Sequence, residues 1–446
     1  MTTLWIMAVL ILTCTGIYST LCLVLGVARV LDRRSVGRLR GPDWPVSGPV
    51  PSTTSVAALI AAHNEELVIE RTIASAQSQV GLANIYVVSD GSNDATVQEA
   101  LAAGANVFEL TPNRGKGGAI AAGLEHFGLY ERYEYVLFLD ADTILSPDYL
   151  RTGLPLFSDP SVAAVSGTPR TIWHPRALSP VGQLLHAYRE RIYCWVSVAL
   201  KYGQAWHRAN TVVVVPGFAS MYRTAALRQI DTAAPGHVIE DINMTFEIHR
   251  QRLGKIAFHP RAAIAYTQDP DTFADYVKQV KRWALALWQA VRRQGFLHGG
   301  FFWVSLVILV VDLIPCCVIL CLTPILITLD LVTDFSGLAW TPGGPLGWLL
   351  TWFGLRLLLI VVILPEFFMA TVMAISFGRP RYLVLALGFP FLRVLDAALV
   401  LYTLPLAWVT RSTGIWVSPT RRAATSHVSE SSDDRDDRTL VGVGRS

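Results

Sequence analysis

Charged side chains are scarce in this sequence. They make up 16% of the 446 residues, whereas hydrophobic side chains make up 52%. The formal net charge of +3 is small, so the composition does not indicate the strongly basic surface on which nucleic-acid binding depends. We therefore expect no nucleic-acid partner. The apolar excess lies at the two ends of the chain, which points to membrane segments around a soluble middle.

Cysteine and lysine are also rare. The six cysteines lack the spacing of a metal site, and five of them lie in apolar segments, where a small packing residue is the expected role. Arginine is the usual cation of this chain, so the position of a lysine indicates a specific role more strongly than the position of an arginine does. The lysines are Lys116, Lys201, Lys255, Lys278 and Lys281.

No charged side chain occurs in residues 1–28. A secretory signal peptide would need basic residues before a shorter apolar run and a small-residue cleavage site, and none of these is evident. The run from Leu4 to Ala28 is long enough to cross a hydrocarbon core of about 30 Å. The arginines that follow it favour the cytoplasmic side. We therefore predict a transmembrane helix at 1–31, a linker at 32–54 and a cytoplasmic middle of the chain. The arginines are Arg29, Arg33, Arg34, Arg38 and Arg40.

The middle of the chain, residues 55–271, alternates predicted strands with predicted helices. This alternation predicts a doubly wound, mainly parallel α/β sheet. In such a sheet ligands bind at the carboxyl ends of the strands. The expected strands are 56–62, 85–89, 106–110 and 135–140, and the expected helices are 66–79, 96–103 and 116–127. The polar residues at the predicted strand ends are Asn64, Asp90, Asn113, Asp140 and Asp142.

Residues 272–294 have apolar side chains at helical spacing together with several cations. A basic amphipathic helix with tryptophans is typical of the membrane interface, although a core-facing helix has the same apolar spacing. Within 295–411, three apolar stretches can each span a bilayer. The stretches are Phe296–Leu329, Leu346–Phe377 and Tyr382–Val409.

Ionisable residues inside these stretches are costly at membrane depth, so they line a wet path or brace the helix bundle. An Arg393–Asp396 pair at i, i+3 is one bracing arrangement. Three spans after the soluble middle would put the C-terminus outside, whereas Arg411, Arg421 and Arg422 favour the inside. A re-entrant last stretch or a hairpin in one long segment would resolve this conflict. We expect a disordered tail at 412–446. The ionisable residues are Asp312, Arg356, Glu366, Arg393 and Asp396.

Two aspartates, Asp140 and Asp142, follow the apolar run Tyr135–Leu139. Carboxylates so close together repel each other unless a cation or a basic group lies between them. Mg²⁺ takes carboxylate and phosphate oxygens, which suits a nucleotide diphosphate. The pair therefore predicts a divalent-metal site, although Asp-x-Asp alone is a weak signal.

Three further groups point to chemistry. Lys116 lies among glycines at a predicted helix start, where a phosphate is favoured, although the spacing is not that of a Walker loop. Asp241 could be a general base, or it could cap the helix that follows it. On the amphipathic helix, Arg282 could neutralise a pyrophosphate and Trp283 could stack on a sugar.

Taken in order, these segments resemble the membrane-bound, inverting family 2 glycosyltransferases, which include the poly-N-acetylglucosamine, hyaluronan, cellulose and chitin-oligosaccharide synthases. The last segment matches the Gln-x-x-Arg-Trp of that family. The resemblance implies a glycosyltransferase domain of the A type flanked by transmembrane helices, with Mg²⁺ or Mn²⁺ as cofactor. The segments are AAHNEE at 61–66, SDGSND at 89–94, GKGGAI at 115–120, DADT at 140–143, GTPR at 167–170, ED at 240–241 and QVKRW at 279–283.

The resemblance also implies residue roles. Asp241, beside Glu240, would be the catalytic base, and Asp142 with Asp140 would hold the metal. Phe218, Ser220 and Trp283 would bind the acceptor, although Ala219 departs from the Cys-Gly-Ser that the family often carries there. The nucleotide-sugar contacts would be Ala62, Asn64, Glu65, Asp90, Lys116, Asp140, Gln279, Arg282 and Trp283.

The expected activity is therefore transfer from a UDP-sugar, first UDP-N-acetylglucosamine and second UDP-glucose, to a growing polysaccharide. A single transfer to a lipid or a cell-envelope glycolipid is the alternative. A non-catalytic membrane transporter would not need acids at so many strand ends. The resemblance places the protein in the plasma membrane as a multi-pass protein with a cytoplasmic catalytic domain. The bilayer is then a partner, and assembly into a homo-oligomer would widen a path between four spans.

Overall fold

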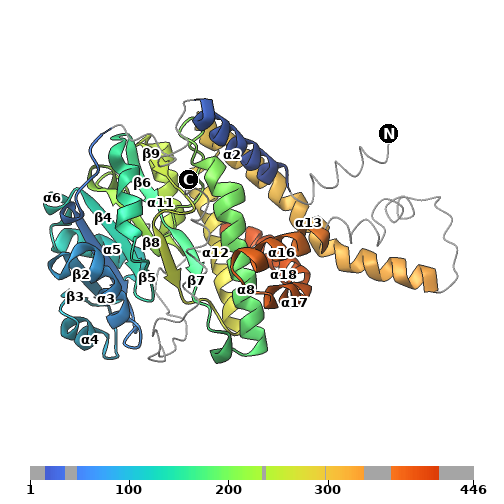
Figure 1. Ribbon diagram of the computed structural model, residues 1–446, viewed down its shortest axis with the longest axis horizontal. Helices are drawn as coiled ribbons and strands as arrows, with labels where there is room; N and C mark the ends of the chain where they lie inside the picture. The colour runs from blue at the N-terminus through green and yellow to red at the C-terminus, as the bar shows by residue number, and fades with distance from the viewer. Residues whose placement is uncertain (1–15, 36–47, 234–237, 297, 336–362, 411–446) are drawn as a thin grey trace, which may run out of the picture.

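The computed structural model describes residues 16–35, 48–233, 238–296, 298–335 and 363–410 (Figure 1). A seven-stranded sheet forms the centre of its α/β part, in the order β3-β2-β1-β4-β8-β6-β9. Only β8 runs antiparallel to its neighbours, and every other pair in this sheet is parallel. The strands are β1 (Val56–Ala62), β2 (Ile85–Asp90), β3 (Asn106–Leu110), β4 (Tyr135–Asp140), β6 (Val162–Ser166), β8 (Ala219–Arg223) and β9 (Lys255–Ala257).

A second sheet has three strands in the order β5-β10-β7. It consists of β5 (Ile144–Leu145), β10 (Ile264–Thr267) and β7 (Thr168–Thr171). The helices of the α/β part are α3 (Ile69–Val80), α4 (Thr96–Ala102), α5 (Gly115–His126), α6 (Leu129–Arg132), α7 (Tyr149–Gly153), α10 (Thr224–Leu227) and α11 (Glu240–Arg250). Short 3₁₀ turns are η1 (Thr53–Ser55), η2 (Leu82–Asn84), η3 (Leu154–Ser158) and η4 (Pro175–Ala177).

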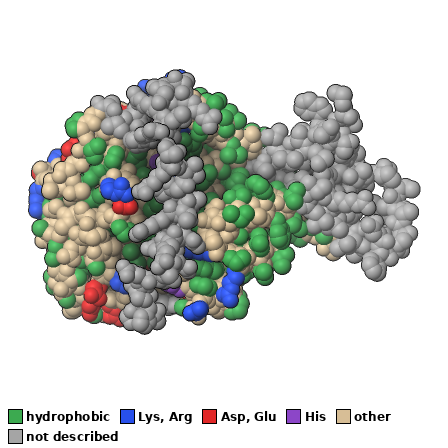
Figure 2. All heavy atoms as spheres, in the orientation of Figure 1, with side chains coloured by type: hydrophobic (Ala, Val, Ile, Leu, Met, Phe, Trp, Pro, Cys, Tyr) green, Lys and Arg blue, Asp and Glu red, His purple; other side chains and the backbone are tan. Residues whose placement is uncertain are grey.

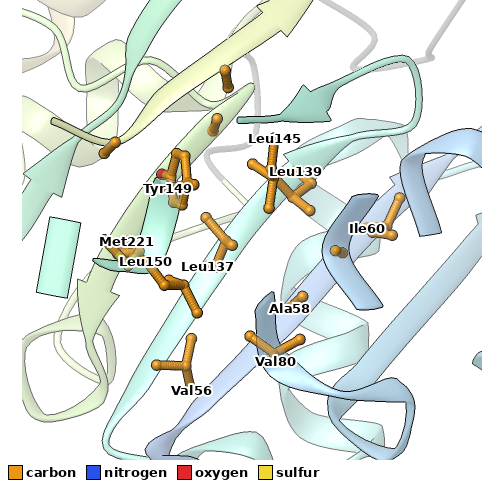
Figure 3. Close-up of a cluster of buried hydrophobic side chains, with 14 of the residues drawn as sticks. Val56, Ala58, Ile60, Val80, Leu137, Leu139, Leu145, Tyr149, Leu150 and Met221 are labelled. Carbon is orange, nitrogen blue, oxygen red and sulfur yellow. The ribbon is translucent and has the colours of Figure 1, made fainter. Parts of the chain in front are cut away.

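The main sheet is buried on both faces. Alternate residues of β1 point to opposite sides, so Val56, Ala58 and Ile60 belong to one apolar cluster and Ala57 and Leu59 to another. Figure 3 shows the first cluster, in which side chains of β1, β4 and β8 meet those of α3 and α7. β1, β2 and β4 are near-continuous apolar runs, as a sheet covered on both faces requires, whereas the edge strand β3 is partly exposed.

The predicted order of strands and helices is confirmed. β1, β3 and β4 begin and end at the predicted residues, and β2 is one residue longer than expected. The helix predicted from Glu66 begins only at Ile69, because the backbone forms a turn in which Val68 and Ile69 donate to the carbonyl of Glu65. The mainly parallel α/β fold with strand ends at one edge is therefore as the sequence predicts.

The helix α12 (Phe273–Gln294) lies between the α/β part and the C-terminal helices. Its Thr272 hydroxyl accepts from the backbone N–H of Asp275 at 3.2 Å, which fixes the start of the helix. One part of its buried face packs with α8 and α18, and another packs with α11. Packing inside the protein accounts for the apolar spacing, so the placement of α12 at a membrane surface stays a prediction.

The remaining helices are long or apolar. They are α2 (Ile17–Ser35), α8 (Pro180–Trp195), which continues through a π-helical segment (Val196–Lys201) into α9 (Tyr202–Gln204), α13 (Phe301–Phe335), α16 (Leu364–Ser376), α17 (Arg381–Leu385), the 3₁₀ turn η7 (Ala386–Gly388) and α18 (Phe389–Val409). Figure 1 places α2 beside α13, and these helices are in contact.

Two stretches, Phe301–Leu329 and Arg381–Val409, are long and apolar enough to cross a membrane. The predicted stretch Leu346–Phe377 is described only from residue 363, as the 13-residue helix α16, so its Arg356 lies outside the described residues. The predicted helix at 1–31 is described from residue 16, the predicted linker at 32–54 lies partly outside the described residues, and the predicted tail lies wholly outside them.

The ionisable residues described in these helices have partners. Asp312 accepts from the backbone N–H groups of Ile17 and Tyr18, both at 3.0 Å, and so caps α2. Arg393 contacts Glu366 at 2.6 Å rather than forming the pair with Asp396 that the spacing allows. Both arrangements brace the bundle. Asp396 accepts from the hydroxyls of Tyr188 at 3.0 Å and Tyr276 at 2.6 Å, and Glu366 also contacts Arg191.

Candidate active site

A cavity of about 1630 Å³ lies against the ends of β4, β7 and β10 and the starts of α5, β8 and α11. Side chains from segments far apart in the sequence meet on its wall. They include the predicted site residues Lys116, Asp140, Asp142, Phe218, Glu240, Asp241, Gln279, Arg282 and Trp283.

Lys116, in the first turn of α5, forms ion pairs with two acidic side chains of this wall. Its Nζ lies 2.5 Å from Asp140 and 3.1 Å from Glu240, and it donates to the carbonyl of Gly217 at 3.2 Å. Burial alone would lower the pKa of the amine, but the carboxylates of Asp140 and Glu240 outweigh it and raise that pKa. Lys116 is therefore a fixed cation among acids.

Asp241 lies in the first turn of α11, beside this cluster. Its Oδ2 accepts from the backbone N–H of Gly217 at 3.1 Å. Its buried Oδ1 has no hydrogen-bond partner among the described residues. Burial and the neighbouring Glu240 raise the pKa of Asp241 to about 6, against the opposing effect of Lys116. A carboxylate that ionises near neutral pH and keeps one oxygen available has the properties of a general base.

Gly217 allows these groups to approach. A Cβ at this position would lie 2.9 Å from both Lys116 Nζ and Glu240 Oε1. The sequence singled out Phe218 and Ser220 in this segment, and the position of Gly217 directly before them was the available signal. The backbone of Gly217 joins Lys116 to Asp241 through its carbonyl and its N–H.

Asp140 and Asp142 form the predicted metal pair. Both line the cavity, and Asp142 is only 7% exposed. Among the described residues no group of three His, Cys, Asp or Glu side chains is placed to hold a metal ion. Mg²⁺, however, is usually bound through one or two carboxylates plus substrate phosphates and water. Two carboxylates on the wall beside Lys116 fit a metal that the diphosphate helps to coordinate.

Lys201 also lines the cavity, although no motif in the sequence predicts a role for it. It ends the π-helical segment Val196–Lys201, a type of helix that often occurs at functional sites. Its Nζ donates to the hydroxyl of Ser166 at 3.0 Å and lies 5.4 Å from the centre of the Phe258 ring. Burial lowers the pKa of this amine to about 8. The scarcity of lysine was the one signal that could have drawn attention to it.

Gln279, Arg282 and Trp283 enter the cavity from one face of α12. Their i, i+3 and i+4 spacing puts them on neighbouring turns. Arg282 is exposed, whereas one face of the Trp283 ring packs against the guanidinium of Arg189, whose Cζ lies 4.0 Å from the ring centre. The α12 motif therefore faces the same space as the acidic strand ends.

Five predicted residues lie near this cavity but do not form its wall. Asp90 Oδ1 accepts from the backbone N–H of Arg114 at 2.8 Å, which ties the end of β2 to the loop between β3 and α5. Asn64 Oδ1 accepts from the backbone N–H of Asn93 at 2.8 Å, which ties the loop after β1 to the loop after β2. The Ser220 hydroxyl is engaged with backbone groups of Pro216 and Gly167. Their ligand roles stay predictions. The five residues are Ala62, Asn64, Glu65, Asp90 and Ser220.

Comparisons with known proteins agree with this geometry. A family profile described as "Glycosyltransferase like family 2" matches residues 51–286. A poly-beta-1,6-N-acetyl-D-glucosamine synthase of Staphylococcus epidermidis is 26% identical over 235 residues, which are 51% of this chain and 53% of that protein. The synthase of the same name from Staphylococcus aureus is 27% identical over 241 residues, 53% and 55% of the two chains. The chain therefore spans about half the length of the curated relatives it matches.

Among solved structures, a mannosyltransferase of Pyrobaculum calidifontis in complex with GDP-Man and Mn²⁺ has a similar fold. It superimposes with a TM-score of 0.50 at 18% identity, covering 86% of this chain and 99% of that one. At this identity the likeness concerns the fold, which is that of the A-type glycosyltransferases.

Proposed function

Because the chain belongs to the glycosyltransferase-like family 2, we propose that it transfers a sugar from a UDP-sugar to a growing polysaccharide, with UDP-N-acetylglucosamine as the first donor to test and UDP-glucose as the second. The curated relatives, which make poly-N-acetylglucosamine by name, support the first donor. The observation that carries the proposal is the meeting of Lys116, Asp140, Asp142, Asp241 and Arg282 on one cavity wall.

The proposed reaction is a single displacement with inversion. Asp241 takes the proton of an acceptor hydroxyl through its available Oδ1, and the hydroxyl oxygen attacks the anomeric carbon on the face opposite the nucleotide. Lys116 and Arg282 stabilise the negative charge that builds on the departing diphosphate. A divalent metal ion held by Asp142 and Asp140 would add further charge compensation for the diphosphate oxygens.

We further propose that the apolar C-terminal helices lie in a membrane. The two candidate spans are only 17% and 22% buried within the protein, whereas the core helix of a soluble protein would be mostly buried. Figure 2 shows hydrophobic side chains gathered over the region where Figure 1 places α16, α17 and α18. Apolar patches of this extent mark a membrane or partner surface. We place these helices in the plasma membrane and the α/β part in the cytoplasm.

One observation favours a second candidate, transfer to a lipid-linked acceptor. The same cavity extends to the apolar helices, where Leu309 and Leu313 of α13 and Val400 of α18 form part of its wall, with Tyr18 of α2 beside them. A lipid chain would find apolar contacts there. The length of the product separates the two candidates, since a single transfer gives no polymer.

The test compares the wild-type protein with Asp241→Asn in the presence of Mg²⁺ or Mn²⁺ and a panel of UDP-sugars. The variant should lose sugar transfer by about a hundredfold or more and keep its affinity for UDP, because the amide cannot accept the proton. Asp148→Asn is the matched control, since Asp148 is exposed and its one ion pair among the described residues is with Arg151 at the surface. Transfer by Asp241→Asn at the rate of the wild type would refute the assignment of the base.

A further inference from the structure

A buried ion pair, Arg189–Asp269, forms a part of the cavity wall that no motif marks. Arg189 of α8 is 0% exposed, and Asp269, just after β10, is 4% exposed. Arg189 Nε donates to Asp269 Oδ1 at 3.2 Å. The hydroxyl of Tyr193 donates to the same oxygen at 2.7 Å and accepts from Arg189 Nη2 at 3.1 Å. These contacts hold both side chains in one orientation.

Each member of the pair keeps one hydrogen-bonding group unused. Arg189 Nη1 and Asp269 Oδ2 are buried and have no hydrogen-bond partner among the described residues. Buried polar atoms are nearly always satisfied, and an unsatisfied charged group is expensive to keep. Both residues line the cavity, so a ligand there that offers both an acceptor and a donor would satisfy these two groups.

The surroundings of the pair resemble a sugar site. The Arg189 guanidinium lies over the Trp283 ring at 4.0 Å, which fixes the ring in the cavity. Gln279 Oε1, one turn earlier on α12, is a further buried acceptor without a partner among the described residues. Aromatic rings pack against the apolar faces of sugar rings, while hydroxyls at the ring edge both donate and accept hydrogen bonds.

The charge of the pair decides between two kinds of ligand. Arg189 and Asp269 neutralise each other, so the pair itself offers no net positive charge to a phosphate group, and Asp269 Oδ2 would repel one. A neutral hydroxyl pair is attracted by both. The site of Lys116 and Arg282, with its cations aimed at the cavity, is the one suited to the diphosphate.

We propose that Arg189 and Asp269 bind hydroxyl groups of a neutral acceptor sugar whose ring lies against Trp283. This inference rests on the proposed glycosyl transfer and names the chemical class of the acceptor end, a neutral carbohydrate. Arg189 Nη1 donates to one hydroxyl, and Asp269 Oδ2 accepts from another. The acceptor is thereby held in the cavity that also contains Asp241.

Direct binding tests the inference without turnover. The full chain in detergent micelles is titrated calorimetrically with a β-1,6-linked N-acetylglucosamine pentasaccharide and with cellopentaose, in the absence of donor. Arg189→Lys removes the Nη1 donor and keeps the charge, and Asp269→Asn keeps an acceptor for Arg189 Nε and replaces the free acceptor by a donor. Each variant should weaken binding of the oligosaccharide about tenfold or more and leave UDP affinity within about twofold.

Arg379→Lys is the matched control. Arg379 also pairs with a buried carboxylate of α8, Glu190, and with a tyrosine, Tyr382, but it does not line the cavity. The control should bind the oligosaccharide as the wild type does. Wild-type protein that binds neither oligosaccharide, or variants that bind as tightly as the control, would overturn the inference. If the wild-type protein binds the oligosaccharide but does not bind UDP, the result would instead refute the proposed donor.

Discussion

At the scale of single residues, the protonation of Asp241 controls the proposed chemistry. Its pKa is raised to about 6 by burial and by Glu240, so the base is ionised above this pH and protonated below it. We expect kcat to fall by about tenfold for each pH unit below 6, as for a reaction with one essential base. The measurement is UDP release against pH at saturating donor and acceptor.

Unfolding in acid could produce a similar loss of activity, and the sign of the pKa shift separates the two. A raised pKa means that the folded state binds the proton more tightly than the unfolded state does. Through this group, stability therefore falls as pH rises from about 4 to about 6, and it does not fall on acidification. Thermal melting at the same pH values should show a folded protein at pH 5. A melting temperature that collapses together with kcat would contradict the assignment to Asp241.

At the scale of elements, much of the α/β part could be predicted. β1 and β4 are apolar runs followed or closed by polar residues, and this local pattern determines where they begin and end. The strand ends also placed Asp140 and Asp142 at one edge. A local sequence pattern predicts an apolar helix face but does not identify what packs against it. The apolar face of α12 suits a membrane or a protein neighbour equally well.

The parts of the site that escaped prediction depend on distant contacts. Arg189 and Asp269 are 80 residues apart in sequence, and neither belongs to a short motif. Lys201 reaches the cavity through a π-helical segment, whose widened turn the usual helical period does not represent. Asn64 and Asp90 were placed at the correct sheet edge, yet their hydrogen bonds to loop backbone could not be read from strand ends.

Gly167, the residue after β6, packs closely against Ala219 of β8, and this contact can be tested by mutation. A Cβ on Gly167 would lie 1.7 Å from the carbonyl oxygen of Ala219, a backbone atom that cannot move without disturbing the sheet. Gly167→Ala should therefore lower the free energy of unfolding by about 1–3 kcal/mol or more. Denaturant unfolding measures it, with Gly299→Ala as the control because no atom lies within 4 Å of that added Cβ. Equal stability of the two variants would contradict the close strand contact.

At the scale of the whole molecule, α12 connects the candidate active site to the C-terminal helices. Its Gln279, Arg282 and Trp283 line the cavity, while Trp288 donates to the carbonyl of Val400 in α18 at 3.0 Å. A movement of α18 would therefore shift α12 and, with it, Gln279, Arg282 and Trp283. The cavity also reaches α13 through Leu309 and Leu313 and α18 through Val400, so the candidate site is continuous with the C-terminal helices.

The apolar surface itself makes the last prediction. Leu387 is 70% exposed and Phe391, one turn later, is 63% exposed, so both point away from the protein. A lysine at the centre of a membrane helix costs about 2.5–3.5 kcal/mol, so Leu387→Lys with Phe391→Lys should shift protein from the carbonate-resistant membrane fraction to the extractable or aggregated fractions. Leu67→Lys with Leu101→Lys is the control, since these leucines are 48% and 56% exposed on the α/β part. The control should remain in the membrane fraction and keep transfer activity. A wild-type protein found in the soluble fraction without detergent would refute the membrane placement, because the exposed leucine and phenylalanine would then face water.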